Sequence, residues 1–81
     1  MKRRNDIDIS ADILRIAMEG AKKSHIVYKA NLNFQVVKRY LERLHKAGLI
    51  AFPSFNGRLF QTTSRGKEYL NRYEHLANYL R

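Results

Sequence analysis

The sequence predicts a mainly α-helical domain with one small β-hairpin. Apolar residues recur at helical spacing through most of the chain. A strand-like pattern replaces this spacing between residues 49 and 62, where Asn56-Gly57 separates two apolar runs. The 81 residues include only four glycines, one proline and no cysteine. This length and composition predict a single domain, residues 1–81, without disulfides.

The first helix is expected over residues 8–18, with Asp6 as its N-cap and Gly20 as its stop. Apolar side chains cover most of its circumference, and one face holds Ile9, Ile13, Ile16, Ala17 and Gly20. A second apolar stripe consists of Ile7, Leu14 and Met18. A helix this apolar either contacts a second subunit or lies between two other helices of the same chain.

Two further helices follow, separated by a tight turn. The shorter one is expected from Ser24, a good N-cap, to residue 30, and the longer one over residues 34–47, between Asn33 and Gly48. The buried face of the longer helix is expected to hold Phe34, Val37, Tyr40, Leu41 and Leu44. Its opposite face holds Gln35, Arg39, Glu42 and Lys46, flanked by Lys38 and Arg43. This arrangement predicts a helix-turn-helix.

The hairpin admits two registers. A two-residue turn at Asn56-Gly57 would pair Pro53 with Phe60 at a hydrogen-bonded site, where proline has no N–H to donate. A three-residue loop, residues 55–57 with Gly57 left-handed, instead sets Phe52 opposite Phe60. The second register is predicted.

The last helix is expected to begin at Thr63 or Ser64 and to end at Leu80. One seam along it consists of Tyr69, Tyr73, Leu76 and Leu80. This seam continues beyond what a small core can cover, so we expect a homodimer that buries it together with the Ile7, Leu14 and Met18 stripe. The competing expectation is a monomer in which the first and last helices cover each other.

The positive charge is concentrated in the middle of the chain. Residues 21–67 hold ten basic side chains and one acidic one, whereas the charges of both ends sum to zero, so the whole net charge of +9 lies there. Such a segment is typical of a polyanion-binding surface. A basic but inert surface is the alternative.

Duplex DNA is the leading candidate partner, because an α-helix fits the major groove. Gln35 and Arg39 can read bases through paired hydrogen bonds, and Arg58 on the hairpin can reach the minor groove or the backbone. For Glu42, an internal ion pair with Lys38, Arg39 or Lys46 is favoured over a cytosine contact. The predicted DNA contacts are Lys22, Lys23, Ser24, Lys29, Asn33, Gln35, Lys38, Arg39, Glu42, Arg43, Lys46, Asn56, Gly57 and Arg58.

Other function classes have weaker support. His25, His45 and His75 stand twenty and thirty residues apart, without metal-site spacing, so no catalytic residue, metal or cofactor is predicted. No apolar run approaches a membrane span of ~20 residues, and we expect a soluble cytoplasmic protein associated with the nucleoid. An RNA binder would expose more aromatic rings than Phe55, and a protein-interaction module would use Val36 with Phe55.

The order of these elements, together with short motifs, resembles one family. The motifs are Gly20-Ala21-Lys22-Lys23, Ile26-Val27-Tyr28, Ala30-Asn31-Leu32, Tyr40-Leu41-Glu42-Arg43-Leu44, Gly48-Leu49-Ile50 and Thr63-Ser64-Arg65-Gly66-Lys67-Glu68-Tyr69-Leu70, along with the spacing of Ile9 and Ile13. The chain resembles small archaeal winged-helix DNA-binding proteins, both chromatin-associated and regulator-like. The resemblance implies a recognition helix at residues 33–47, a wing tip at 56–58 and a dimerisation helix at 65–81. Many such relatives extend that helix into a longer antiparallel coiled coil, whereas this sequence ends at Arg81.

Overall fold

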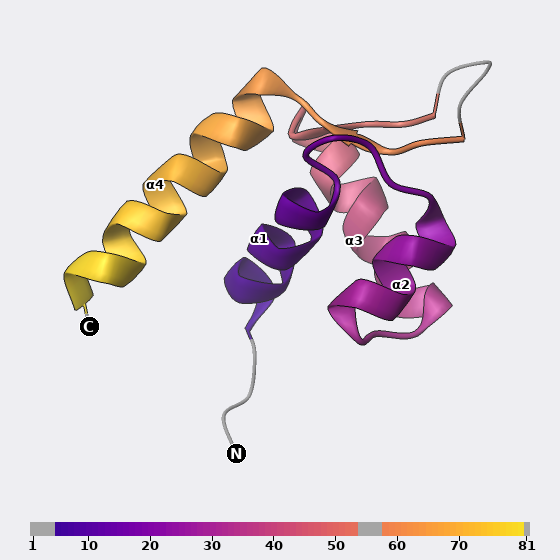
Figure 1. Cartoon of the computed structure of the whole chain (residues 1–81), viewed down its shortest axis with the longest axis horizontal. Coiled ribbons are helices and arrows are strands. Elements are labelled where there is room, and N and C mark those ends of the chain that lie inside the picture. Colours follow the sequence, from indigo (N-terminus) through magenta and orange to yellow (C-terminus); the bar gives the residue numbers. More distant parts are fainter. Residues whose placement is uncertain (1–4, 54–57, 81) are drawn as a thin grey trace.

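Four helices and an antiparallel hairpin make up the part of the chain that the computed structural model describes, residues 5–53 and 58–80. They follow in the order α1 (Asp6–Ile16), α2 (Lys23–Ala30), α3 (Phe34–Lys46), β1 (Ile50–Ala51), β2 (Gln61–Thr62) and α4 (Ser64–Leu80). Figure 1 shows α1 between α4 and the α2–α3 pair, with the hairpin at one end of α3. The mainly helical fold class with a hairpin wing is confirmed.

The helix starts differ from the prediction at two places. Asn5, not Asp6, caps α1, since its side-chain oxygen accepts a hydrogen bond from the Asp8 N–H at 2.8 Å. Asn and Asp are nearly equivalent caps, so the sequence could not choose between adjacent positions. Ser24 is not the N-cap of α2, because the helix already begins at Lys23. The preceding Ala21 is paired with Phe60, and the chain enters the helix directly from that bridge.

The turn between α2 and α3 is as predicted. Asn31 adopts the left-handed conformation at φ 57°, which asparagine tolerates well. Asn33 then caps α3 by accepting the Val36 N–H at 2.8 Å. The predicted stop is also present, with Gly48 at φ +77° after the helix.

The predicted hairpin register is confirmed, although the strands are shorter than expected. Ile50 pairs with Thr62 and Ala51 with Gln61, which sets Phe52 opposite Phe60 when the register is continued. Pro53 lacks an N–H, and Phe60 exchanges both of its backbone hydrogen bonds with Ala21, at 2.8 and 2.9 Å. Regular pairing therefore ends early. The predicted loop conformation, with Gly57 left-handed, lies outside the described residues.

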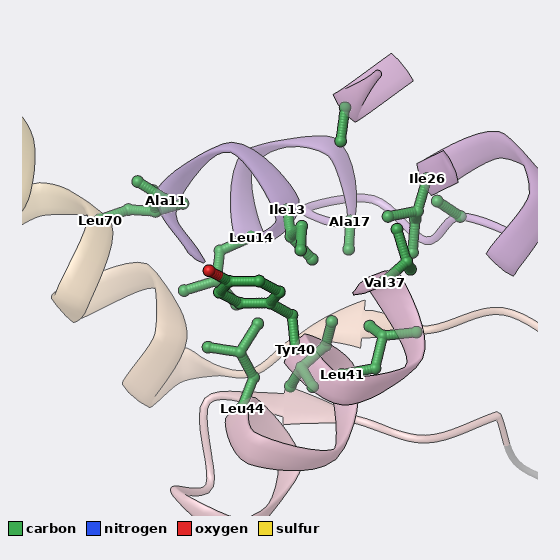
Figure 2. Close-up of a cluster of buried hydrophobic side chains, with 13 residues drawn as sticks. Ala11, Ile13, Leu14, Ala17, Ile26, Val37, Tyr40, Leu41, Leu44 and Leu70 are labelled. Carbon is green, nitrogen blue, oxygen red and sulfur yellow. The ribbon is translucent and has the colours of Figure 1, made fainter. Parts of the chain in front are cut away.

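The burial of side chains in the structure corrects two of the predictions, those for Leu14 and Phe34. Leu14 is 0% exposed and sits among the side chains of α1, α3 and α4 (Figure 2), so it offers nothing to a second subunit. Phe34 is 55% exposed rather than part of the buried face of α3. It is the first residue of that helix, one turn before Val37, the first buried position. The buried face consists of Val37, Tyr40, Leu41 and Leu44.

Close backbone contacts lock the hairpin and α4 onto the helices. The buried Thr62 hydroxyl donates to the Leu14 carbonyl at 2.6 Å, and its N–H donates to Ala17 O at 3.0 Å. On α4, a Cβ added to the buried Gly66 would lie 2.1 Å from the Leu49 carbonyl oxygen. The direction of α4 thus depends on a glycine at this position. None of the helices described has the length and apolar content that a membrane span needs.

Candidate nucleic-acid interface

The solvent-facing side of α3 is a continuous polar surface, which we name the α3 outer face. Every one of its six side chains is exposed, and the residues are Gln35, Lys38, Arg39, Glu42, Arg43 and Lys46. The opposite side of the helix is buried in the core. Packing therefore fixes which residues α3 presents, as the sequence pattern predicted.

Arg43 is held at the rim of this face by α1. Its guanidinium lies 3.4 Å from the Asp6 carboxylate and 5.4 Å from the centre of the Tyr40 ring. The Tyr40 hydroxyl donates to the same carboxylate at 2.6 Å. This hydrogen bond, and then Arg43, hold the pKa of Asp6 below its ordinary value, while acceptance by Asp6 raises the pKa of Tyr40. Asp6 thus links α1 to α3 and partly balances the charge of Arg43.

Glu42 does not form the predicted internal ion pair. Among the described residues, no basic side chain lies within 4.0 Å of its carboxylate. It lies instead beside a hollow of about 510 Å³ between α3 and the residues after β1, lined by Arg39, Glu42, Arg43, His45, Lys46 and Phe52. An exposed carboxylate in a basic surface keeps its acceptor capacity open.

Stacked rings join the end of α3 to the hairpin. The His45 and Phe52 ring centres are 4.1 Å apart, and Phe52 meets Phe60 edge-on at 5.3 Å. His45 Nδ1 also lies 3.2 Å from the Ile50 carbonyl oxygen. The His45 side chain is exposed, and through these contacts it holds the wing against the end of α3. The one sequence feature that could have indicated this contact was the predicted pairing of Phe52 with Phe60, which brings an aromatic ring to the end of the helix.

The remaining predicted contacts flank α3. Lys22, Ser24 and Lys29 on and before α2 are exposed. Lys23 is half-buried and shares a small hollow with Lys38. The further predicted contacts are the exposed Asn33, the exposed Arg58 at φ 55°, and Asn56 and Gly57, which lie outside the described residues.

Sequence reasoning missed three exposed aromatic side chains among the described residues of the basic segment, residues 21–67. Tyr28 on α2 is 81% exposed, Phe34 on α3 is 55% exposed, and Phe52 after β1 is 40% exposed. The sequence analysis expected Phe34 in the buried face of the helix and gave Phe55 as the exposed ring. Phe55 lies outside the described residues. Val36 is half-buried against the core and gives little area to a protein partner.

Apart from the fully buried Leu14, the predicted dimer residues divide into two groups. Ile7, Leu76 and Leu80 are exposed, as is Tyr79, which the seam did not include. Met18, Tyr69 and Tyr73 are half-buried against the chain's own core. The Tyr73 hydroxyl donates to the Asp8 carboxylate, which raises the pKa of Tyr73, and Arg15 lies 3.2 Å from Glu74. The first turns of α4 therefore pack on α1, while its last turns keep apolar side chains in solvent.

Comparison with known proteins agrees with this architecture. Among solved structures the chain is similar to Sso10a-2, a DNA-binding protein from Sulfolobus solfataricus, with a TM-score of 0.81 and 27% identity over 93% of this chain and 80% of that one. It is also similar to NMB1585, a MarR family regulator from Neisseria meningitidis, with a TM-score of 0.69 and 27% identity over 86% of this chain and 53% of that one.

No curated protein matches the sequence. A family model described as winged helix-turn-helix matches residues 3–81. The match spans nearly the whole chain and agrees with the observed order of helices and hairpin. The chain therefore belongs to the winged helix-turn-helix family.

Proposed function

We propose that this protein binds duplex DNA as a homodimer, with α3 in the major groove and the hairpin against the adjacent minor groove or backbone. The observation that carries the proposal is the α3 outer face, where six polar side chains are exposed opposite a buried apolar face. The structural similarity to a DNA-binding protein and to a regulator supports this binding role. The protein would serve as a transcriptional regulator or a chromatin-associated protein in the cytoplasm, at the nucleoid.

The roles of the α3 residues follow from their chemistry. Arg39 and Gln35 have the paired donors or acceptors that distinguish guanine and adenine edges. Lys38 and Lys46 present single charges suited to phosphates. Arg43, tethered to Asp6 at the rim, would contact the backbone beside the groove.

Glu42 is the residue whose proposed role changes with the structure. Its carboxylate has no ion pair among the described basic residues, so it would repel phosphates if it faced the backbone. A carboxylate in the major groove can accept a hydrogen bond from the cytosine amino group. The open geometry supports a cytosine contact over an internal pair.

The dimer would form through the last turns of α4. Leu76, Tyr79 and Leu80 are exposed there, and Ile7 of α1 is exposed as well. An isologous contact between two copies would remove these side chains from water and present two α3 helices to one duplex. Leu14 takes no part, because it is already buried.

A parallel titration tests the proposal. Fluorescence anisotropy with a fixed-length duplex DNA, the corresponding duplex RNA and the single strands, at one salt concentration, should give the tightest binding with duplex DNA. The control variant is Arg72→Ala, which removes an exposed positive charge, paired with Glu68, from α4 rather than from α3. It should leave the order of affinities unchanged. Tightest binding to duplex RNA would contradict the proposal.

Single-stranded nucleic acid is a second candidate, favoured by the exposed rings of Tyr28 and Phe34. Aromatic side chains in a basic setting can stack on unpaired bases. In the same titration this function would give the tightest binding with a single strand, and Tyr28→Ala would weaken that binding without affecting the duplex.

A further inference from the structure

Phe34 stands exposed at the start of the helix that presents the polar surface. It is the first residue of α3 and is 55% exposed, although the apolar pattern of the helix places it beside buried positions. The cap formed by Asn33 with the Val36 N–H fixes the first turn, so the position of Phe34 is set by the fold. Its exposed ring therefore offers apolar surface at the start of the helix that presents the polar face.

The neighbours of Phe34 belong to the α3 outer face. Gln35 follows it directly, and Lys38 lies one helical turn further along the same edge, both exposed. In a helix-turn-helix, the N-terminal residues of the recognition helix are those that reach base edges. Phe34 would therefore enter the major groove beside Gln35.

The major groove offers one apolar group among the base edges, the C5 methyl of thymine. We propose that Phe34 packs on a thymine methyl group and that, with Gln35 reading an adjacent adenine, the first turn of α3 selects A·T-containing sequence. This inference rests on the proposed duplex DNA binding. It adds a specificity-determining residue that recognises a methyl group rather than a charge.

Removing the methyl group from DNA tests the contact without altering the protein. A preferred duplex is first obtained by selection from random sequence, and each thymine is then replaced in turn by deoxyuridine, which pairs identically but lacks the methyl group. One position should lose about fourfold in affinity, the equivalent of one buried methyl group. Phe34→Ala should bind the thymine and deoxyuridine duplexes equally, whereas Phe34→Leu should retain part of the difference.

Tyr28→Ala is the matched control, because Tyr28 is an exposed aromatic residue on α2 rather than α3, and this variant should keep the wild-type methyl dependence. The inference is overturned if no thymine shows a methyl effect, if the selected site contains no thymine, or if the effect persists in Phe34→Ala. A protein that binds duplex DNA but shows no methyl effect refutes only this inference. A protein that binds no duplex at all refutes the proposed function, and this inference with it.

Discussion

At the scale of single residues, small or polar side chains at helix contacts decide how the elements of this fold are placed. Gly66 allows the first turn of α4 to rest against the Leu49 carbonyl, and the Thr62 hydroxyl ties the hairpin to the end of α1. Neither residue has a signal in the hydrophobic pattern, because a glycine in a helix and a threonine in a strand are common in many settings. Their roles depend on which distant backbone atoms they meet.

Substitution of Gly66 by alanine should destabilise the protein. In an exposed helix the change would add about 1 kcal/mol of stability through helix propensity. Here the new Cβ would lie 2.1 Å from a carbonyl oxygen, so we expect the cost of overpacking to exceed the gain in helix propensity. The free energy of unfolding should then fall by roughly 1 to 3 kcal/mol. Urea denaturation measures the change, and Lys67→Ala, at the exposed neighbouring position, is the control. A more stable Gly66→Ala variant would contradict the close packing of α4.

The Asp6 contacts predict a loss of stability in acid. Because the Tyr40 hydroxyl and Arg43 hold the pKa of Asp6 below its unfolded value, the folded state binds this proton less readily. The contribution of ionised Asp6 to folding stability is therefore complete above the pKa that Asp6 has in the unfolded chain, about 4. It disappears as the pH falls from there through the lower pKa of Asp6 in the folded state. Asp6→Asn should therefore lose less stability over this range than the wild type in urea denaturation.

Glu19→Gln provides the control for that experiment. Glu19 is exposed on the turn after α1 and makes none of the described ion pairs, so its removal should leave the acid dependence close to that of the wild type. Equal acid dependence in Asp6→Asn and the wild type would mean that the Asp6 contacts do not persist in solution.

At the scale of elements, the proposal gives Arg39 of α3 the reading of a base and Lys23 of α2 a phosphate contact. Arg39→Ala should cost roughly 1 to 3 kcal/mol on a selected duplex and less on a shuffled one, since a guanidinium can pair with a guanine edge. Lys23→Ala, at the start of α2, should weaken both duplexes about equally, because an ammonium group on a phosphate reads no sequence. Anisotropy titrations with the two duplexes measure both effects. An equal loss on both duplexes for Arg39→Ala would make Arg39 a backbone contact.

Most of these elements could be predicted from the sequence, because their signals are local. Asn33 and Gly48 mark the ends of α3, and the missing N–H of Pro53 selects the hairpin register. The contact of Ala21 with Phe60 could not be predicted, since those residues are far apart in sequence and neither favours pairing strongly. For the same reason the start of α2 was misplaced.

The site was predicted less completely than the fold. Helical periodicity identified the α3 outer face, but it could not show that Phe34 escapes burial or that Leu14 is covered entirely by the chain's own core. The exposure of a residue at the edge of an apolar stripe depends on where the neighbouring helix ends. Likewise, side-chain directions that spacing alone does not fix decide that no described basic side chain pairs with the Glu42 carboxylate.

At the scale of the whole molecule, α1 and α4 cover each other only in part. The contacts of Tyr73 with Asp8 and of Arg15 with Glu74 join them, while Leu76 and Leu80 remain exposed near the end of α4. We expect the wild type to sediment as a dimer at micromolar concentration. Leu76→Glu combined with Leu80→Glu should give a monomer with weaker DNA binding, because buried unpaired charges would oppose association.

A matched double variant controls for added charge. Asn71 and Asn78 are exposed on the side of α4 away from Leu76 and Leu80, so Asn71→Glu combined with Asn78→Glu should still sediment as a dimer. A monomeric wild type would exclude the dimer and leave the proposal of DNA binding by single copies.

The central claim, that the basic middle of the chain binds duplex DNA, is tested most directly by the salt dependence of the affinity of the wild-type protein. Residues 21–67 carry ten basic side chains against one acidic one. If about six of the basic groups contact phosphates, counterion release predicts that the affinity falls roughly a thousandfold between about 50 and about 200 mM salt. An affinity that stays the same over this range would contradict the claim.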